Sequence, residues 1–215
     1  MIISRGRRYI FVHIPKTGGT ALSLALEQRA MADDILIGDT PKAVRRRARV
    51  KALRGSGRLW KHSMLSDIHG LVSDEEMAEF FVLTLVRNPW DRMVSYYHWL
   101  RAQGFDHVAV GLAKRLEFDG FLEHPHVQAS IELSPYSSYL TDQNGRENCS
   151  LFARIEHLSE DLVPFEEHLG FVLGDIERAN TSDRAENYRT YYSDDKAALV
   201  ARLCHTDITR FGYRF

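Results

Sequence analysis

A lysine, two threonines and two glycines stand together near the start of the chain. This segment consists of Pro15, Lys16, Thr17, Gly18, Gly19 and Thr20. Glycine lets backbone N–H groups approach an anion closely, and a helix that begins here would add unpaired N–H donors and a partial positive charge. Lys16 adds a full charge, and the hydroxyls of Thr17 and Thr20 add donors. The cluster therefore predicts an anion-binding loop rather than a plain turn in which a threonine caps a helix.

The loop differs from the phosphate loop of nucleotide triphosphatases. In that loop, G-x-x-x-x-G-K-[ST], the lysine follows the glycines and the hydroxyl of the last residue binds magnesium. Here Lys16 precedes Gly18 and Gly19. The shorter loop suits a smaller anionic group.

A second cation, Arg87, directly follows the apolar run 80–86. Nucleotide triphosphatases commonly end such a strand with an aspartate that holds magnesium. An arginine in that place favours a second phosphate rather than a metal. Ser95 follows Asn88 by seven residues, which returns to nearly the same face of a helix at about 100° per residue. We therefore expect Arg87 and Ser95 to bind one anion together; the alternative is a surface arginine beside a solvated serine.

Alternating strands and helices are expected to position both cations. Apolar runs predict buried strands over residues 9–14, 80–86 and 150–155. Helices are predicted after the glycine loop, from Pro89 with Asn88 as N-cap, and over 158–169 and 194–204. The segment 104–143 is expected to be helical but irregular. This alternation predicts an α/β fold with a mainly parallel sheet.

Length and composition bound the class of protein. The 215 residues predict a single domain, 1–215, and the 44% of hydrophobic residues excludes a wholly disordered chain. No apolar run approaches the roughly 18 residues of a membrane span, and the basic start lacks the apolar stretch of a signal peptide. Two cysteines, Cys149 and Cys204, are too few for a disulfide scaffold and are typical of a reducing compartment. A cytoplasmic location is expected.

Two phosphate-sized sites on neighbouring strand ends, without a set of metal ligands, restrict the choice of nucleotide. 3′-Phosphoadenosine 5′-phosphosulfate (PAPS) meets this demand, because it carries a 5′-phosphosulfate and a separate 3′-phosphate. PAPS is therefore the expected donor co-substrate, with no metal.

The sequence resembles the PAPS-dependent sulfotransferases, specifically the carbohydrate branch that includes the heparan-sulfate 2-O-sulfotransferases and their bacterial relatives. The run 13–20 looks like the 5′-phosphosulfate loop of that family, and 86–92 with Ser95 looks like its 3′-phosphate element. Weaker similarities lie at 154–158 with Asp161, at 187–192, and at 207–213. The resemblance implies a three-layer, P-loop-like α/β fold with a mainly parallel central sheet flanked by helices, and no metal requirement.

Sulfuryl transfer needs a base for the acceptor hydroxyl and a positive charge for the leaving phosphate oxygen. Lys16 is the candidate for the second role, with residues 17–20 holding the 5′ end of the donor. His62 lies where similar sulfotransferases carry a catalytic histidine, so it is the candidate base. His69, with Asp67 as its partner, is the next candidate, and some relatives use a glutamate instead. His13 is more typical of a packed histidine than of a base.

Two further groups of cations are candidates for binding. Arg184 and Arg189 lie in the C-terminal part, where the family commonly completes its adenine and 3′-phosphate contacts; the alternative is a solvated loop. Lys61, beside His62, is a candidate for binding the sulfate. The chain lacks the glycine- and lysine-rich C-terminal loop of the cytosolic small-molecule sulfotransferases, which argues against a phenol or steroid acceptor and favours a carbohydrate or another hydroxyl acceptor.

A strongly basic segment precedes His62. Residues 42–61 contain nine lysines and arginines and no acid, which leaves 19 basic and 29 acidic residues in the rest of the chain. The near-neutral total therefore conceals a local positive field that is expected to guide an anionic acceptor such as an acidic polysaccharide. The alternative is a solvated helix. Charge reversal at Arg46 and Arg49 is expected to raise the acceptor KM and leave donor affinity unchanged.

Two other functions compete with this interpretation. A nucleotide or small-molecule kinase would need a magnesium-binding aspartate at the end of the 80–86 run, which the sequence does not offer. A non-catalytic binder of nucleic acid or another polyanion would use residues 43–58, but no aromatic residue interleaves that basic run before Trp60. Nucleic acid is therefore not an expected partner, and the sequence does not indicate an oligomeric state.

Overall fold

Chain contacts divide the protein into two units, each built from two separate segments. The computed structural model describes residues 1–176 and 184–215. Unit 1 comprises Met1–Val86 and Tyr136–Asn180, and unit 2 comprises Arg87–Pro135 and Thr181–Phe215.

A five-stranded sheet forms the centre of unit 1, in the order β3-β1-β2-β4-β5. The strands are β1 (Ile2–Ser4), β2 (Tyr9–Val12), β3 (Ile35–Leu36), β4 (Phe81–Val86) and β5 (Leu151–Arg154). The pairs β2–β4 and β4–β5 are parallel, whereas β1 is antiparallel to both of its neighbours. All described strands except β1 therefore run in one direction, which confirms the mainly parallel sheet. The expected strands correspond to β2, β4 and β5.

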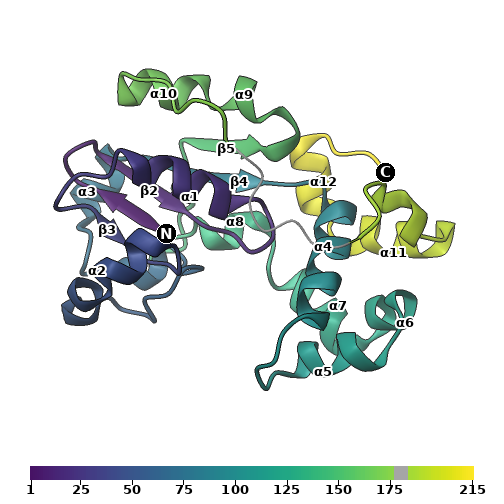
Figure 1. Cartoon of the computed structure of the whole chain (residues 1–215). Coiled ribbons are helices and arrows are strands. Elements are labelled where there is room, and N and C mark those ends of the chain that lie inside the picture. The colour runs from purple at the N-terminus through teal and green to yellow at the C-terminus, as the bar shows by residue number, and fades with distance from the viewer. Residues whose placement is uncertain (177–183) are drawn as a thin grey trace. The chain divides into compact units, whose positions relative to one another are not determined.

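Helices flank this sheet. They are α1 (Gly19–Gln28), α2 (Pro41–Ala52), α3 (Asp74–Glu79), α8 (Tyr136–Tyr139), α9 (Leu158–Asp161) and α10 (Val163–Leu169), with 3-10 turns η1 (Ser66–Ile68) and η2 (Ile155–His157). Leu22 and Leu26 of α1 share one buried cluster with Phe11 of β2 and Leu83 of β4. Figure 1 shows α1 across the front of the sheet, with α3 and α8 behind it. The helix expected over 158–169 is divided at Leu162 into α9 and α10.

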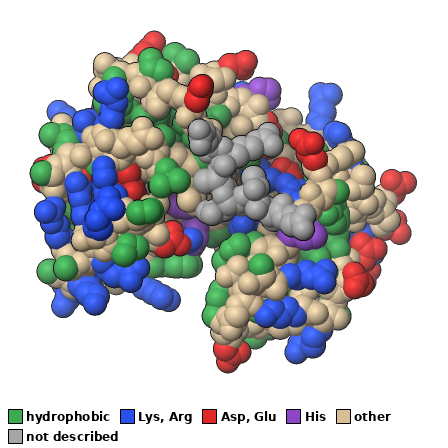
Figure 2. Space-filling view, viewed as in Figure 1, with side chains coloured by type: hydrophobic (Ala, Val, Ile, Leu, Met, Phe, Trp, Pro, Cys, Tyr) green, Lys and Arg blue, Asp and Glu red, His purple; other side chains and the backbone are tan. Residues whose placement is uncertain are grey.

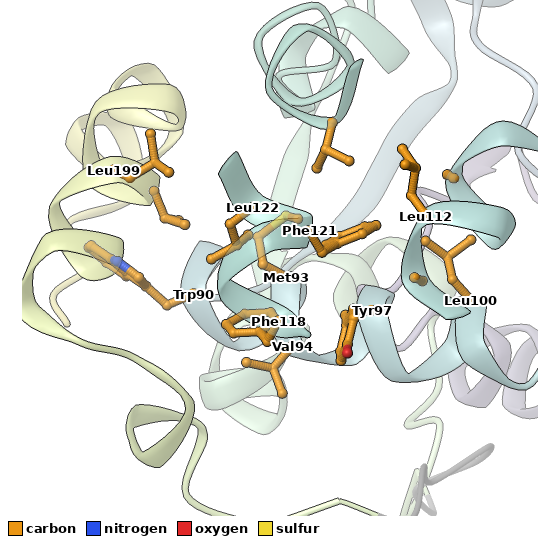
Figure 3. Close-up of a cluster of buried hydrophobic side chains, with 14 of the residues drawn as sticks. Trp90, Met93, Val94, Tyr97, Leu100, Leu112, Phe118, Phe121, Leu122 and Leu199 are labelled. Atoms are coloured by element: carbon orange, nitrogen blue, oxygen red, sulfur yellow. The ribbon is translucent and has the colours of Figure 1, made fainter. Parts of the chain in front are cut away.

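Unit 2 is helical. Its elements are α4 (Pro89–Arg101), α5 (Val108–Arg115), α6 (Phe118–Glu123), α7 (Pro125–Glu132), η3 (Tyr188–Tyr191), α11 (Asp194–Leu203) and α12 (His205–Phe211). Its core gathers the buried face of α4, including Trp90 and Tyr97, against Phe121 and Leu199 (Figure 3). Residues 104–143 form the short helices α5 to α8, so the expected irregular helical segment is confirmed. Among the described helices, none has both the length and the apolar character needed to cross a membrane.

Candidate active site

The loop between β2 and α1 has the backbone geometry of an anion cradle. Lys16 and Gly18 both lie in the left-handed region, with φ of 66° and 81°. Gly18 is the N-cap of α1; no side-chain hydrogen bond caps this helix, and its first turn has no acidic residue. Backbone N–H donors and the positive end of α1 are therefore not neutralised by a side chain at this cap.

The side chains of His13 and Thr17 fix the shape of this loop. A Cβ atom on Gly19 would lie 2.3 Å from Cδ2 of the His13 ring, so only glycine allows the loop to pass this histidine. The Thr17 hydroxyl is buried and donates to the Ile14 carbonyl at 2.9 Å. Thr17 thus holds the loop with its hydroxyl, and its backbone N–H is the group it offers to a ligand. The sequence predicts hydroxyl donors at both Thr17 and Thr20. Thr20 is half-buried, and its hydroxyl remains the candidate donor to a ligand.

His62 packs directly behind the loop. Its Nδ1 lies 2.7 Å from the His13 carbonyl oxygen, and its ring is edge-on to the rings of His13 and Trp60 at 4.7 and 5.1 Å between centroids. A carbonyl can only accept, so Nδ1 carries the proton and Nε2 of the neutral ring keeps its lone pair. Burial lowers the pKa of His62 to about 4. Neutral His62 therefore has the tautomer that a base requires.

The other candidate base is placed differently. The His69 side chain is 40% exposed, and its Nδ1 faces Asp74 at 3.8 Å. The Asp67 carboxylate instead accepts from the Met64 backbone N–H at 2.8 Å. The expected pairing of His69 with Asp67 is therefore wrong, because Asp67 is used to close a turn of the backbone. Lys61 forms an ion pair with Asp39 at 2.6 Å.

The turn after β4 begins unit 2 and gathers two arginines on one carboxylate. Arg87 donates through Nε to Asp91 at 2.8 Å, and Arg184 donates through Nη2 to the other oxygen of Asp91 at 2.7 Å. Nη1 of Arg184 is buried and has no hydrogen-bond partner among the described residues. A buried donor of this kind is costly unless a ligand satisfies it. This pair of arginines is thus a strong candidate for binding an anion.

Unit 2 also contains the predicted N-cap Asn88 and the candidate binding residues Ser95 and Arg189. The Asn88 side chain accepts from the backbone N–H groups of Trp90 and Asp91, which confirms its role as N-cap of α4. Ser95 lies on α4 and is buried. The Arg189 guanidinium lies over the rings of Tyr188 and Phe215, at 5.4 and 5.9 Å from their centroids. The structure therefore brings Arg184, and not Arg189, to the carboxylate that also holds Arg87.

Asp91 is the residue that sequence reasoning missed. Arg87 precedes Asn88, the N-cap of α4, and Asp91 lies in the first turn of this helix. Their spacing of four residues is the local signal for the ion pair, which has a contact of 2.6 Å. The bond of Asp91 to Arg184 crosses 93 residues of sequence, and such a contact has no local signal.

The strands that precede the loop and the turn, β2 and β4, lie side by side in the sheet of unit 1. β2 and β4 are parallel neighbours, and the Thr84 hydroxyl donates to the Val12 carbonyl at 2.8 Å. Both strands therefore end at the same edge of the sheet, the edge at which α/β proteins commonly bind ligands. The described residues contain no group of three or more His, Cys, Asp or Glu side chains that could hold a metal ion.

Comparisons with known proteins identify similar sequences and folds. A sequence model described as "Sulfotransferase family" matches residues 1–214. Among solved structures, mouse sulfotransferase SULT7A1 complexed with PAP is similar in fold. The TM-score is 0.50 at 15% identity, and the match covers 93% of this chain and 83% of the mouse chain. A comparison with curated proteins found no match.

Proposed function

The chain belongs to the sulfotransferase family, and from that membership we propose that it moves a sulfuryl group from PAPS to a hydroxyl of a carbohydrate acceptor without a metal. The observation that carries this proposal is the pair of anion-binding elements that follow β2 and β4. One is the strained loop with Lys16, and the other is the arginine pair held by Asp91. Both units together form the single catalytic domain in this proposal, and the protein is proposed to act in the cytoplasm.

The two elements take opposite ends of the donor. Backbone N–H groups of residues 17–20 and the charge of Lys16 bind the 5′-phosphosulfate. Arg87 and Arg184 bind the 3′-phosphate, which satisfies the buried Nη1 atom of Arg184. Ser95 and Arg189 are proposed as further contacts of the nucleotide.

The chemistry follows from the protonation states. The acceptor oxygen attacks sulfur as its proton passes to Nε2 of His62, and the bond from sulfur to the bridging oxygen of the 5′-phosphate breaks. The products are the sulfate ester and adenosine 3′,5′-bisphosphate. Lys16 stabilises the charge that grows on the leaving oxygen. The negative charge of the bound donor raises the His62 pKa above its buried value of about 4, which makes the histidine a stronger base when PAPS is present.

A transfer assay tests this proposal. Release of adenosine 3′,5′-bisphosphate from PAPS is measured with heparin-derived oligosaccharides as acceptors, in the presence of a metal chelator. We expect acceptor-dependent release that the chelator leaves intact, and a loss of roughly 100-fold or more in Lys16→Met, because a charge that stabilises the transition state is removed. Lys16→Met is checked for folding by circular dichroism. Transfer that requires added Mg²⁺, or normal turnover by a folded Lys16→Met, contradicts the proposal.

A further inference from the structure

A groove beside α2 in unit 1 is bordered by none of the residues that the proposed function assigns to the donor. It has a volume of about 670 Å³ and runs between the C-terminal half of α2 and the following segment 53–61. This volume lies within the roughly 300–1,000 Å³ of known ligand pockets. Figure 2 shows Lys and Arg side chains gathered over the corner of unit 1 where Figure 1 places α2.

The charges that line the groove are unbalanced. Arg47, Lys51, Arg54 and Arg58 all border it, and none of them forms an ion pair with a carboxylate in the described part of the chain. Arg47 and Lys51 are four residues apart on one helix face, where like charges repel each other. A helix with this pattern is stabilised by an anion that lies across these side chains.

The groove also has an apolar surface that a naked inorganic anion would not use. Trp60 borders it and is 43% exposed, although large aromatic side chains are usually buried. Val50, Leu53 and Leu59 line the same groove, and the Arg58 guanidinium lies 5.4 Å from the Trp60 ring centroid. Arg54 donates to the backbone carbonyls of Lys51 and Leu53, so Arg47, Lys51 and Arg58 are the cations of the groove that can meet a ligand. An exposed indole beside cations without a carboxylate partner among the described residues suits a ligand with both C–H faces and negative charges. An acidic sugar chain has this combination.

A series of aromatic ring contacts connects Trp60, which borders the groove, with the candidate base His62. Trp60 contacts His62, His62 contacts His13, and the His13 ring lies directly against Gly19 of the donor loop. A ligand on Trp60 therefore lies one ring contact away from His62. All of these residues belong to unit 1.

We propose that this groove is the acceptor site, in which Trp60 stacks on a sugar ring and Arg47, Lys51 and Arg58 bind carboxylate or sulfate groups of an anionic oligosaccharide. The inference rests on the proposed function, since it assigns the acceptor of the same reaction. It also refines the expectation for the basic segment. Arg46 and Arg49 donate to backbone carbonyls of Met31, Ala32 and Asp34, so they hold the preceding loop and are poor positions for testing the acceptor.

The test compares two charge-neutralised variants of the same helix. Arg47→Gln/Lys51→Gln removes groove charges, whereas Arg45→Gln removes an exposed charge that does not border the groove. Trp60→Ala removes the stacking surface. With a heparin-derived hexasaccharide as acceptor, we expect the double variant and Trp60→Ala each to raise KM about tenfold or more. kcat and the affinity for adenosine 3′,5′-bisphosphate should stay unchanged. Arg45→Gln should keep the normal KM.

Direct titration of the hexasaccharide separates this inference from the proposed function. Binding of the hexasaccharide to the wild type that is lost in the double variant supports the groove even if no transfer is detected. An equal effect of Arg45→Gln and the double variant shows a general field and overturns the groove. A DNA oligonucleotide that binds through the groove residues while the hexasaccharide does not bind also overturns it.

Discussion

One hydrogen bond decides which nitrogen of His62 can act as a base. The His13 carbonyl holds the proton on Nδ1 at 2.7 Å, and burial keeps the ring neutral. His69, which is exposed and faces Asp74, has no comparable constraint. At the scale of the residue, the structure therefore separates two histidines that the sequence leaves as alternatives.

The pH dependence of the reaction tests His62 as the base. A base must be neutral, so activity is lost as pH falls through its pKa. Burial lowers the pKa of His62 to about 4 in the donor-free protein. We therefore expect the acid limb of kcat/KM for PAPS, which reports the donor-free protein, to lie near that value. We expect His62→Ala to reduce kcat by about 100-fold or more and to bind adenosine 3′,5′-bisphosphate normally. Near-normal turnover by a folded His62→Ala would contradict this role and give it to His69 or a carboxylate.

The connection between β2 and α1 is the element proposed to bind the 5′ end of the donor. Its shape requires the close approach of Gly19 to His13, and a methyl group at that position would lie 2.3 Å from Cδ2 and 2.7 Å from Nε2 of the ring. We expect Gly19→Ala to lower the free energy of unfolding by about 1–3 kcal/mol, the usual cost of overpacking, and to weaken binding of adenosine 3′,5′-bisphosphate.

Gly104→Ala is the matched control for this substitution, because a Cβ at Gly104 would meet no atom within 4 Å. Urea denaturation and calorimetry measure both effects. Equal stability and equal affinity in the two alanine variants would show that the loop does not need its present shape.

Elements with a strong local pattern could be predicted, and those that depend on distant partners could not. The apolar runs of β2, β4 and β5 and the Asn88–Pro89 start of α4 are local signals, and all four are confirmed. The short strands β1 and β3 were missed because each has only two or three residues and depends on its neighbours for pairing. The division at Leu162 was missed because the apolar periodicity continues across it, although Pro164 lacks the N–H donor that a continuous helix needs there.

Residues of the candidate site could likewise be predicted where the signal is local, but not where it depends on a distant partner. The donor loop and Arg87 were visible as local clusters, whereas the bond of Arg184 to Asp91 joins segments 93 residues apart. The sequence also does not reveal that the arginines of α2 make different contacts, because it shows only that residues 42–61 are basic. Packing decides that Arg46 and Arg49 bind backbone carbonyls while Arg47 and Lys51 border the groove.

At the scale of the whole molecule, a nearly neutral chain contains separate positive regions with different tasks. The formal net charge is −1, yet Lys16 lies in the loop after β2, Arg87 and Arg184 share Asp91, and residues 42–61 contain nine lysines and arginines. The proposed donor has two anionic ends, one assigned to the loop after β2 and the other to the arginine pair at Asp91. A nucleotide with only the 5′ group leaves the buried Nη1 atom of Arg184 unsatisfied.

Calorimetric titration tests the two-ended binding of the donor most directly. Adenosine 3′,5′-bisphosphate and adenosine 5′-monophosphate are titrated separately into the protein in the presence of a metal chelator, with Arg87→Ala as the comparison variant. We expect the bisphosphate to bind at least about tenfold more tightly to the wild type, because one set of charge-assisted hydrogen bonds is worth roughly 1.5–3 kcal/mol. We expect most of this preference to disappear in Arg87→Ala. Equal affinity of the wild type for the two nucleotides, or binding that depends on a divalent ion, would contradict a sulfotransferase site that holds its donor by both phosphates.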